Sequence, residues 1–207
     1  MDVFEVMQTS RAMRLLKPDP VPGELVDRIL EAAVCAPNGG NQQKWSFLAV
    51  KDRAVKEQVQ PYYAAALEEA HKYAYAHTPP GTTGAQHDRQ FGEVTHLTEH
   101  FHEAPVWIVL CLDVGEGEPS YGSGASIYPA AQNVLLAARA LGLGATFTNR
   151  HLRYAKEVDA VFGLPPTVRS YAIIPIGYPD KPFGKVRRLP VQQVTHLDRW
   201  GTPYAPS

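Results

Sequence analysis

The stretch Ala36-Pro-Asn-Gly-Gly-Asn-Gln-Gln-Lys-Trp-Ser-Phe47 joins a helical pattern to a strand pattern. Pro37 and the glycine pair 39–40 interrupt the helical pattern, since glycine opens backbone angles that other residues avoid. Trp45 and Phe47 follow with the two-residue period of a strand that enters a core. The stretch therefore predicts a tight turn between a helix and a buried strand.

Four carboxamide side chains crowd into this turn, at Asn38, Asn41, Gln42 and Gln43. A carboxamide offers hydrogen-bond donors and acceptors without a charge. The edge of a flavin or a nucleobase requires such a mixture, because carbonyl and N–H groups alternate along it. Turns rich in asparagine and glycine are also common without any ligand. The segment alone leaves a ligand loop and a plain turn both open.

The composition is that of a folded globular chain. With 207 residues, 44% hydrophobic and 20% charged, the chain has the length and core content of one domain spanning 1–207. A net charge of -1 gives no overall attraction to nucleic acid or to anionic lipid. We therefore expect no nucleic-acid or membrane partner, and any basic site has to be local.

The N-terminus and the cysteines bear on the compartment. The start, Met1–Glu5, lacks a basic segment followed by a long apolar run, and no later run is long enough to cross a bilayer. We expect a cytoplasmic protein. Cys35 and Cys111 are too few for a disulfide framework, and we expect two buried, inert thiols rather than a redox pair.

Two arginines near the N-terminus form a candidate anion site. Arg11 and Arg14 are three residues apart, which places both guanidinium groups on one face if this segment is a helical turn. Two such groups fit a phosphate, because it accepts paired N–H bonds. A solvated basic face is the alternative reading.

Hydrophobic periodicity predicts the remaining elements. We expect helices at 24–34, 54–75, 126–141 and 153–162, and strands at 46–50, 105–112 and 170–176. The strand at 105–112 is nearly all apolar, so both of its faces should be covered. Ser126 is expected to cap its helix, with Pro129 in the first turn. The glycines at 142 and 144 follow a helix, which is the wrong context for a dinucleotide-binding fingerprint.

Two segments between these elements remain ambiguous. The region 77–94 begins with a Pro- and Gly-rich run and is expected to be a mobile loop that covers a substrate cavity. His96 and His100 have a spacing that zinc ligands can use, but the HExxH order is absent. We predict a solvated helix face there, and no metal site.

Taken together, these segments resemble the FMN-dependent nitroreductase family. The motifs that carry the resemblance are Arg11-Ala-Met-Arg14 with Lys17-Pro-Asp-Pro-Val-Pro22, Ala36–Gln43 with Trp45, Pro129–Arg139 with Leu141-Gly-Leu-Gly144, Ile176-Gly-Tyr-Pro179, and Arg187-Arg188-Leu-Pro190. Each motif alone is weak evidence, but five in register over almost the whole chain are specific. One departure is that Ser10-Arg11-Ala12 stands where many members have Arg-Arg-Ser or Arg-His-Ser.

The resemblance implies an α+β fold, in which helices flank a mixed, mainly antiparallel sheet, and an intertwined homodimer with two FMN sites at its interface. The implied FMN contacts are Arg11, Ala12, Met13, Arg14, Arg187 and Arg188 from one copy, Pro37, Asn38, Gly39 and Asn41 from the other, and Phe147, Thr148 and Asn149 beside N5 of the ring. Whether Gln43 touches the flavin is left open. The tail 178–207 would be extended.

The implied chemistry is that of the cofactor. Reduced FMN passes electrons from NADH or NADPH to a nitroaromatic, a quinone or a similar acceptor, by a ping-pong mechanism that needs no catalytic side chain. A flavin-binding or storage protein of the same fold is the main alternative. Flavin fragmentation and dehalogenation are further alternatives, because nothing in the 77–94 region indicates a substrate.

Overall fold

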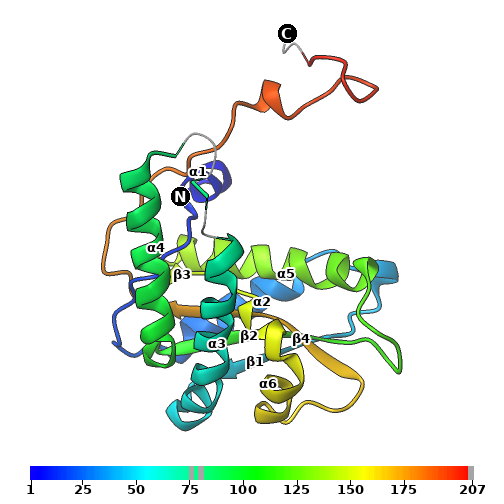
Figure 1. Cartoon of the computed structure of the whole chain (residues 1–207). Coiled ribbons are helices and arrows are strands. Elements are labelled where there is room, and N and C mark those ends of the chain that lie inside the picture. Colours follow the sequence, from blue (N-terminus) through cyan, green and yellow to red (C-terminus); the bar gives the residue numbers. More distant parts are fainter. Residues whose placement is uncertain (75–76, 79–81, 205–207) are drawn as a thin grey trace.

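Helices cover both faces of a four-stranded sheet in the computed structural model of the chain, which describes residues 1–74, 77–78 and 82–204 (Figure 1). The strands are β1 (Trp45–Val50), β2 (Val106–Asp113), β3 (Gly144–Ala145) and β4 (Val168–Gly177). Their order across the sheet is β1-β2-β4-β3, and each neighbouring pair is antiparallel. The predicted α+β class with a mainly antiparallel sheet is confirmed.

Strand β2 forms the centre of the sheet, as its apolar sequence predicts. All of its residues from Val106 to Leu112 are buried, and alternate side chains enter two separate cores. Ile108 and Leu110 face one core, whereas Trp107 and Val109 face the other. The alternation follows from the two-residue period of a strand. Both faces therefore need a covering layer.

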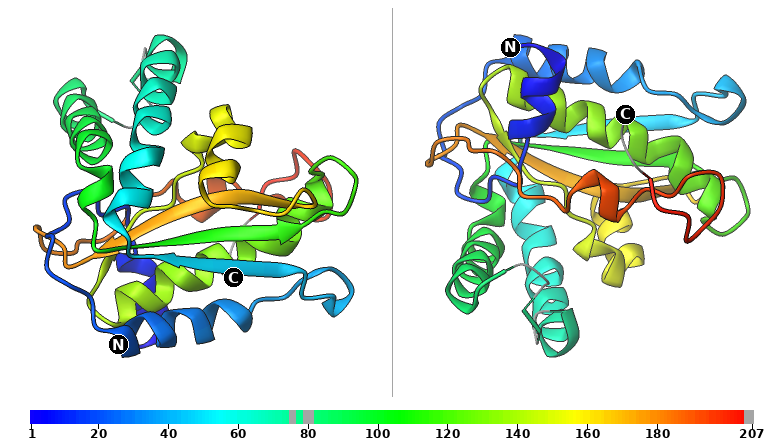
Figure 2. Two further views of the ribbon diagram at one scale, coloured as in Figure 1. Left: turned by 90° about the horizontal axis from the view of Figure 1, so that it is seen from below. Right: turned by 90° about the horizontal axis from the view of Figure 1, so that it is seen from above.

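Helices α2 (Gly23–Val34) and α5 (Tyr121–Ala140) form the first layer (Figure 2). Small residues on α5 allow the close approach of α2, and the Asn133 side chain donates a hydrogen bond of 2.9 Å to the Ala32 carbonyl. Helix α5 begins earlier than expected, because Ser120 and Ser123 form a capping box at its start. Ser126 therefore lies inside the helix, and Pro129 lies beyond the first turn.

The second layer consists of α3 (Arg53–Ala74), α4 (Gly84–Glu99) and α6 (Ala155–Val161), with short 3-10 turns at Phe101–Glu103 and Arg150–Tyr154. The Phe101 ring stacks between Tyr63, at 3.9 Å, and Trp107, at 4.2 Å between ring centroids. The indole N–H of Trp107 donates to the Phe101 carbonyl at 3.0 Å. These aromatic contacts fix the base of α3 and α4 on the sheet.

Helix α4 corrects the expectation of a loop over 77–94. Residues from Gly84 onward are helical, because Thr83 and Gln86 form a capping box in which each side chain accepts the other's backbone N–H. Part of the preceding segment, at 75–76 and 79–81, lies outside the described residues. Residues 84–94 of the predicted loop therefore form a regular helical surface instead.

The N-terminal segment and one cysteine also differ from expectation. Helix α1 (Val3–Thr9) ends before Arg11, so Arg11 and Arg14 are not on a helical turn. Cys35, which directly follows the last residue of α2, is exposed. Cys111 is buried, and burial raises the pKa of its thiol to about 12. No helix among the described residues is both long and apolar enough to span a bilayer.

Candidate functional site

The start of the tail lies beside the N-terminal segment. The Val186 N–H donates to the Gln8 carbonyl at 2.8 Å, and the Asp180 N–H donates to the Leu15 carbonyl at 3.0 Å. The Arg139 guanidinium adds a contact, since it stacks 4.0 Å from the centroid of the Phe183 ring. These contacts bring residues 11–14 close to residues 185–188, although the two segments are separated by most of the sequence.

A cavity of about 680 Å³ lies between these two segments and helix α4. Six of the described residues that line it are cationic: Arg11, Arg14, Arg89, Lys185, Arg187 and Arg188. The one carboxylate among these lining residues is Glu93, which is paired with Lys181 at 3.1 Å. The cavity is therefore strongly electropositive, and its volume suits a small-molecule ligand.

The donor set of this cavity fits a phosphate. Guanidinium groups present planar pairs of N–H donors that match phosphate oxygens. A phosphate monoester carries about 1.5 to 2 negative charges near neutral pH. The arginines from the N-terminal segment and the tail can therefore bind such a group from two sides, although Ser10 and Ala12 replace a basic and a hydroxyl residue in the first motif.

Strand β3 holds the arginine-bearing segment in place. The Met13 N–H donates to the Ala145 carbonyl at 3.0 Å, and the Thr146 hydroxyl donates to the Met13 carbonyl at 2.8 Å. Gly144 makes this contact possible, because a Cβ there would lie 2.8 Å from a Leu16 methyl group and 3.0 Å from the Met13 Cβ. Residues 147–149 continue directly from this junction.

Residues Phe147, Thr148 and Asn149 have different surroundings. Thr148 is buried, its N–H and carbonyl both pair with Ile173, and its hydroxyl lies 3.0 Å from the Tyr63 hydroxyl. The side chains of Phe147 and Asn149 are exposed. The rings of Phe147 and Tyr128 form a T-shaped pair, with 5.7 Å between ring centroids. Thr148 is thus held in place by its hydrogen bonds, and the exposed side chains of Phe147 and Asn149 lie on either side of it in the chain.

A buried polar chain follows this segment directly, and sequence reasoning did not find it. Ser170 donates its hydroxyl proton to Asp159 at 2.5 Å, so the neighbouring His151 Nε2, 3.1 Å away, must carry a proton and donate to Ser170. His151 is fully buried, and this burial lowers its pKa to about 4. The ring is therefore neutral near pH 7 and serves to fix the chain after Asn149.

The carboxamide loop is shaped by its own side chains. The Asn38 side-chain oxygen accepts the Gln43 N–H at 2.9 Å, and the Gly39 N–H donates to the Ser126 hydroxyl at 3.2 Å. Gly40, Asn41 and Gln43 have positive φ values of 59°, 52° and 50°. Glycine and asparagine tolerate this conformation best. Gln43 therefore helps to shape the loop through its backbone.

The structure does not bring the two halves of the expected site together within one copy. The loop contacts α5 at Ser126, near one end, whereas Arg139, near the other end, donates to the Thr9 hydroxyl at 2.9 Å. The span 126–139 of an α-helix corresponds to about 20 Å. The loop residues Pro37, Asn38, Gly39 and Asn41 are thus remote from the arginine cavity.

The α4 wall of the cavity is a feature that sequence reasoning missed. It presents Gln86, Arg89, Gln90 and Glu93, and the tail adds Lys185. The four helical positions have the spacing of a single helix face. This polar stripe is visible in the sequence, but its residues were assigned to a loop. The capping pair Thr83 and Gln86 is the signal that predicts a helix there.

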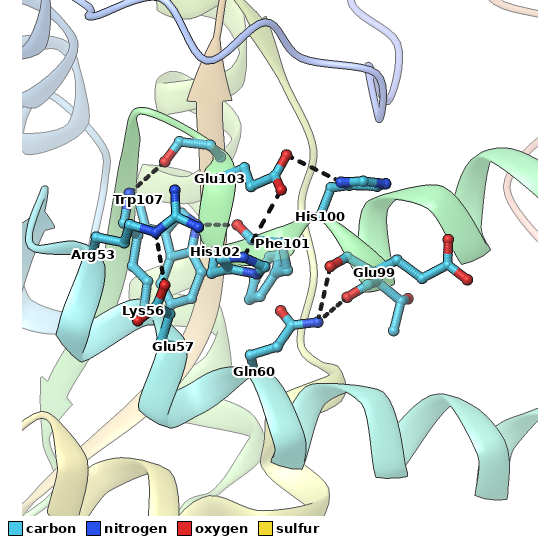
Figure 3. Close-up of polar contacts among 12 residues, drawn as sticks. Arg53, Lys56, Glu57, Gln60, Glu99, His100, Phe101, His102, Glu103 and Trp107 are labelled. Atoms are coloured by element: carbon cyan, nitrogen blue, oxygen red, sulfur yellow. Dashed lines mark hydrogen bonds and ion pairs between the residues drawn. The ribbon is translucent and has the colours of Figure 1, made fainter.

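The histidine-rich C-terminal end of α4 makes hydrogen bonds and ring contacts within the fold (Figure 3). His100 Nδ1 lies 3.0 Å from a Glu103 oxygen, and the His96 and His100 rings are 4.4 Å apart. The buried Lys56 ammonium donates to the Ala104 carbonyl at 2.6 Å, and desolvation lowers its pKa. Within the described part of the chain, no three His, Cys, Asp or Glu residues are grouped as metal ligands would be.

Comparisons with known proteins agree with the resemblance seen in the sequence. The model of the nitroreductase family matches residues 8–178. A protein of Methanothermobacter thermautotrophicus, provisionally named NADH dehydrogenase/NAD(P)H nitroreductase, is 33% identical over 204 residues, which cover 97% of this chain and 88% of that protein. Rat (Rattus norvegicus) iodotyrosine deiodinase 1 is 25% identical over 87% of this chain and 63% of its own length.

A solved structure shares the fold. Iodotyrosine deiodinase bound to FMN and 3-iodo-L-tyrosine superposes with a TM-score of 0.73 at 23% identity, over 97% of this chain and 100% of that chain. The family match over residues 8–178 and the archaeal relative indicate that the chain is an oxidoreductase. The chain belongs to the nitroreductase family.

Proposed function

We propose that the chain is an FMN-dependent oxidoreductase that passes reducing equivalents from NADH or NADPH to a nitroaromatic, a quinone or a similar small acceptor. Family membership and the name of the archaeal relative support this class of reaction. The observation that carries the proposal is the six-cation cavity, whose arginine segment is joined to β3 just before residues 147–149. A phosphate site therefore lies next to a surface that can carry a flat ring.

Each residue near the cofactor has a separate task in this proposal. FMN supplies the hydride chemistry, while the protein supplies position and electrostatics. Arg11 and Arg14 bind its phosphate and polyol end, and Arg187 with Arg188 closes on the phosphate from the tail. Because the Thr148 N–H is already bonded to the Ile173 carbonyl at 3.1 Å, we assign the backbone donor beside N5 to Phe147 or Asn149. Ala12 contributes a backbone contact, whereas Met13, whose N–H and carbonyl already bond to Ala145 and Thr146, holds the segment on β3.

A second copy of the chain completes the site in this proposal. Within one copy the carboxamide loop and the arginine cavity are about 20 Å apart along α5, which exceeds the reach of one side chain. Pro37, Asn38, Gly39 and Asn41 of the other copy then approach the flavin.

The tail supports an intertwined homodimer. Beyond residue 188 it runs away from the body of the molecule (Figure 1). It carries exposed apolar side chains at Leu189, Val191, Val194 and Trp200, the last with 91% exposure. Several large exposed apolar side chains on one segment are typical of an interface, and a second copy that also completes the flavin site is the partner we propose.

An absorbance spectrum of the purified protein tests the proposal. We expect flavin bands, and anaerobic addition of NADPH or NADH should bleach them. An acceptor such as a quinone should then restore the colour, and steady-state rates should give the parallel lines of a ping-pong mechanism. A coloured protein that neither nucleotide bleaches would instead be a flavin-binding or storage protein. A colourless protein that takes up no added FMN would refute both readings.

A reductive dehalogenation is a second candidate, because two of the relatives described above are iodotyrosine deiodinases. The test is release of iodide from 3-iodotyrosine by the reduced protein under anaerobic conditions. A turnover with iodotyrosine that exceeds turnover with a nitroaromatic would favour this candidate. Equal binding of both compounds without iodide release would exclude it.

A further inference from the structure

Helix α4 lines the same cavity as the arginines of the N-terminal segment and the tail. Gln86, Arg89 and Gln90 line it, at positions that share one face of the helix. Gln86 is half-buried and is held by its capping bonds with Thr83. The wall thus combines a guanidinium group with two carboxamides, which are donors that bind an oxyanion or a polar heterocycle.

Contacts at both sides fix the position of this wall. At the C-terminal end of α4, the Gln60 side chain donates to the carbonyls of Thr98 and Glu99, the second at 3.4 Å (Figure 3). Near the cavity, Glu93 pairs with Lys181 of the tail at 3.1 Å. The helix is therefore attached both to α3 and to the tail, and its cavity face does not require a partner to be oriented.

The charge of the cavity exceeds what one phosphate group neutralises. Six cationic residues line it, whereas its one lining carboxylate among the described residues is already paired with Lys181. A phosphate monoester brings about 2 negative charges. Like charges in one cavity repel each other, and a bound anion relieves that repulsion. The excess of positive charge therefore favours a second anionic group in the same cavity.

We propose that α4 binds an anionic group of the second ligand that meets the flavin, and that Arg89 determines this specificity. The inference rests on the proposed function, since the cofactor phosphate is assigned to the arginines at 11, 14, 187 and 188. Arg89 lines the same cavity from α4, an element that is separate in sequence from both of those segments. The group is a phosphate or a carboxylate. Its source is either the 2′-phosphate of NADPH or an acid group on the acceptor.

The experiment compares Arg89→Gln and Arg89→Glu with wild type, with Lys51→Gln as a charge-matched control in the turn between β1 and α3. Calorimetric titration with NADP⁺ and NAD⁺ needs no turnover. Kinetics with 4-nitrobenzoate and neutral 4-nitrobenzyl alcohol test the acceptor. The FMN affinity of each variant is measured separately, so that loss of the cofactor is not mistaken for loss of the second ligand.

We expect Arg89→Gln to weaken one anionic ligand, either NADP⁺ or 4-nitrobenzoate, by about fivefold to tenfold, because one charge-assisted hydrogen bond is lost. Arg89→Glu should weaken it further. Binding of the counterpart that lacks the anionic group, NAD⁺ or 4-nitrobenzyl alcohol, should stay near wild type, as should the FMN affinity and the Lys51→Gln control. Whichever anion responds identifies the source of the group.

Two results would overturn the inference. Unchanged binding of both anionic ligands in Arg89→Glu would show that α4 takes no part in anion recognition. A fall in FMN affinity that matches the fall in anion affinity would assign Arg89 to the cofactor phosphate instead. Failure of the proposed function is a distinct result, since wild type itself would then take up no FMN, and the titration with NADP⁺ and NAD⁺ would still decide the role of Arg89.

Discussion

The arginine cavity and the carboxamide loop are built in opposite ways. The cavity combines residues 11–14, α4 and residues 185–188, which are far apart in the chain and are joined through β3 and the start of the tail. The loop is shaped within a few residues by the Asn38 side chain and by positive φ values, with Ser126 as its contact to α5. One region depends on tertiary structure, and the other on local backbone geometry.

This difference bears on how each region responds to change. A substitution in the cavity removes a charge from an electropositive site that several segments support, so binding should suffer more than stability. A substitution in the loop removes a neutral contact from a surface turn. In the two-copy site that we propose, the cavity supplies most of the affinity for the phosphate and the loop supplies a smaller contribution at the ring.

The largest effect on FMN binding is expected from Arg14→Ala. Loss of a half-buried charge-assisted contact to the phosphate should weaken FMN binding by roughly 10- to 100-fold. Asn41→Gly, which removes the carboxamide but keeps the positive φ accessible, should weaken it by only about threefold to tenfold. Titration of the apoprotein with FMN measures both. Wild-type affinity in the two variants would mean that neither region binds the cofactor.

The buried histidine behind residues 147–149 should give a pH-dependent stability. Its folded pKa of about 4 lies below the ordinary value of 6.5, so between these values the unfolded chain binds a proton that the folded chain does not. Stability is therefore complete above about pH 6.5 and falls as the pH drops toward 4, by about 3 kcal/mol for this group.

Denaturant unfolding from pH 7 to pH 4 measures this effect, with His151→Asn as the comparison. The raised pKa of Asp159, which burial causes, acts in the opposite direction, because stability is lost as the pH rises through that pKa. The difference between the wild-type and variant curves isolates the histidine. If His151→Asn shows the same slope as wild type, the ring is not neutral in the fold as described.

A smaller effect is expected where β3 supports the arginine segment. Gly144→Ala would place a Cβ 3.0 Å from the Met13 Cβ, so the segment must shift, at a cost of about 1–3 kcal/mol. FMN affinity should fall with it. Gly92→Ala is the matched control, because nothing lies within 4 Å of its Cβ and alanine favours the helix by about 1 kcal/mol. Equal melting temperatures for the two variants would contradict the described contact.

Sequence reasoning predicted the parts of the fold that depend on apolar periodicity. The run at 105–112 is apolar at every position, so a central strand follows from it, and α2 and α3 lie close to the predicted ranges. The start of α5 was misplaced because its capping box lies in a Gly- and Ser-rich stretch that resembles a loop. The beginning of α4 was missed for a similar reason, because its capping box follows a Pro- and Gly-rich run that resembles a loop.

The candidate site was only partly accessible from the sequence, for a physical reason. Arg11 and Arg14 are recognisable because guanidinium pairs suit phosphates, and the structure places both on one cavity. His151 carries no local signal, since its partner Ser170 lies on a different element, and the capping pair and polar stripe of α4 indicate a helix but not the cavity that Arg89 lines. The 20 Å separation between loop and cavity likewise follows only from the length and position of α5.

Co-expression of Arg14→Ala and Asn41→Gly chains tests the two-copy site most directly. Each variant alone should bind FMN more weakly than wild type, Arg14→Ala by the larger factor. In a mixed dimer, one site receives the intact cavity of one chain and the intact loop of the other, so about a quarter of all sites should regain wild-type affinity for random pairing. If mass spectrometry proves that mixed dimers are present and no fraction of the sites regains high affinity, the result contradicts a site shared between two copies.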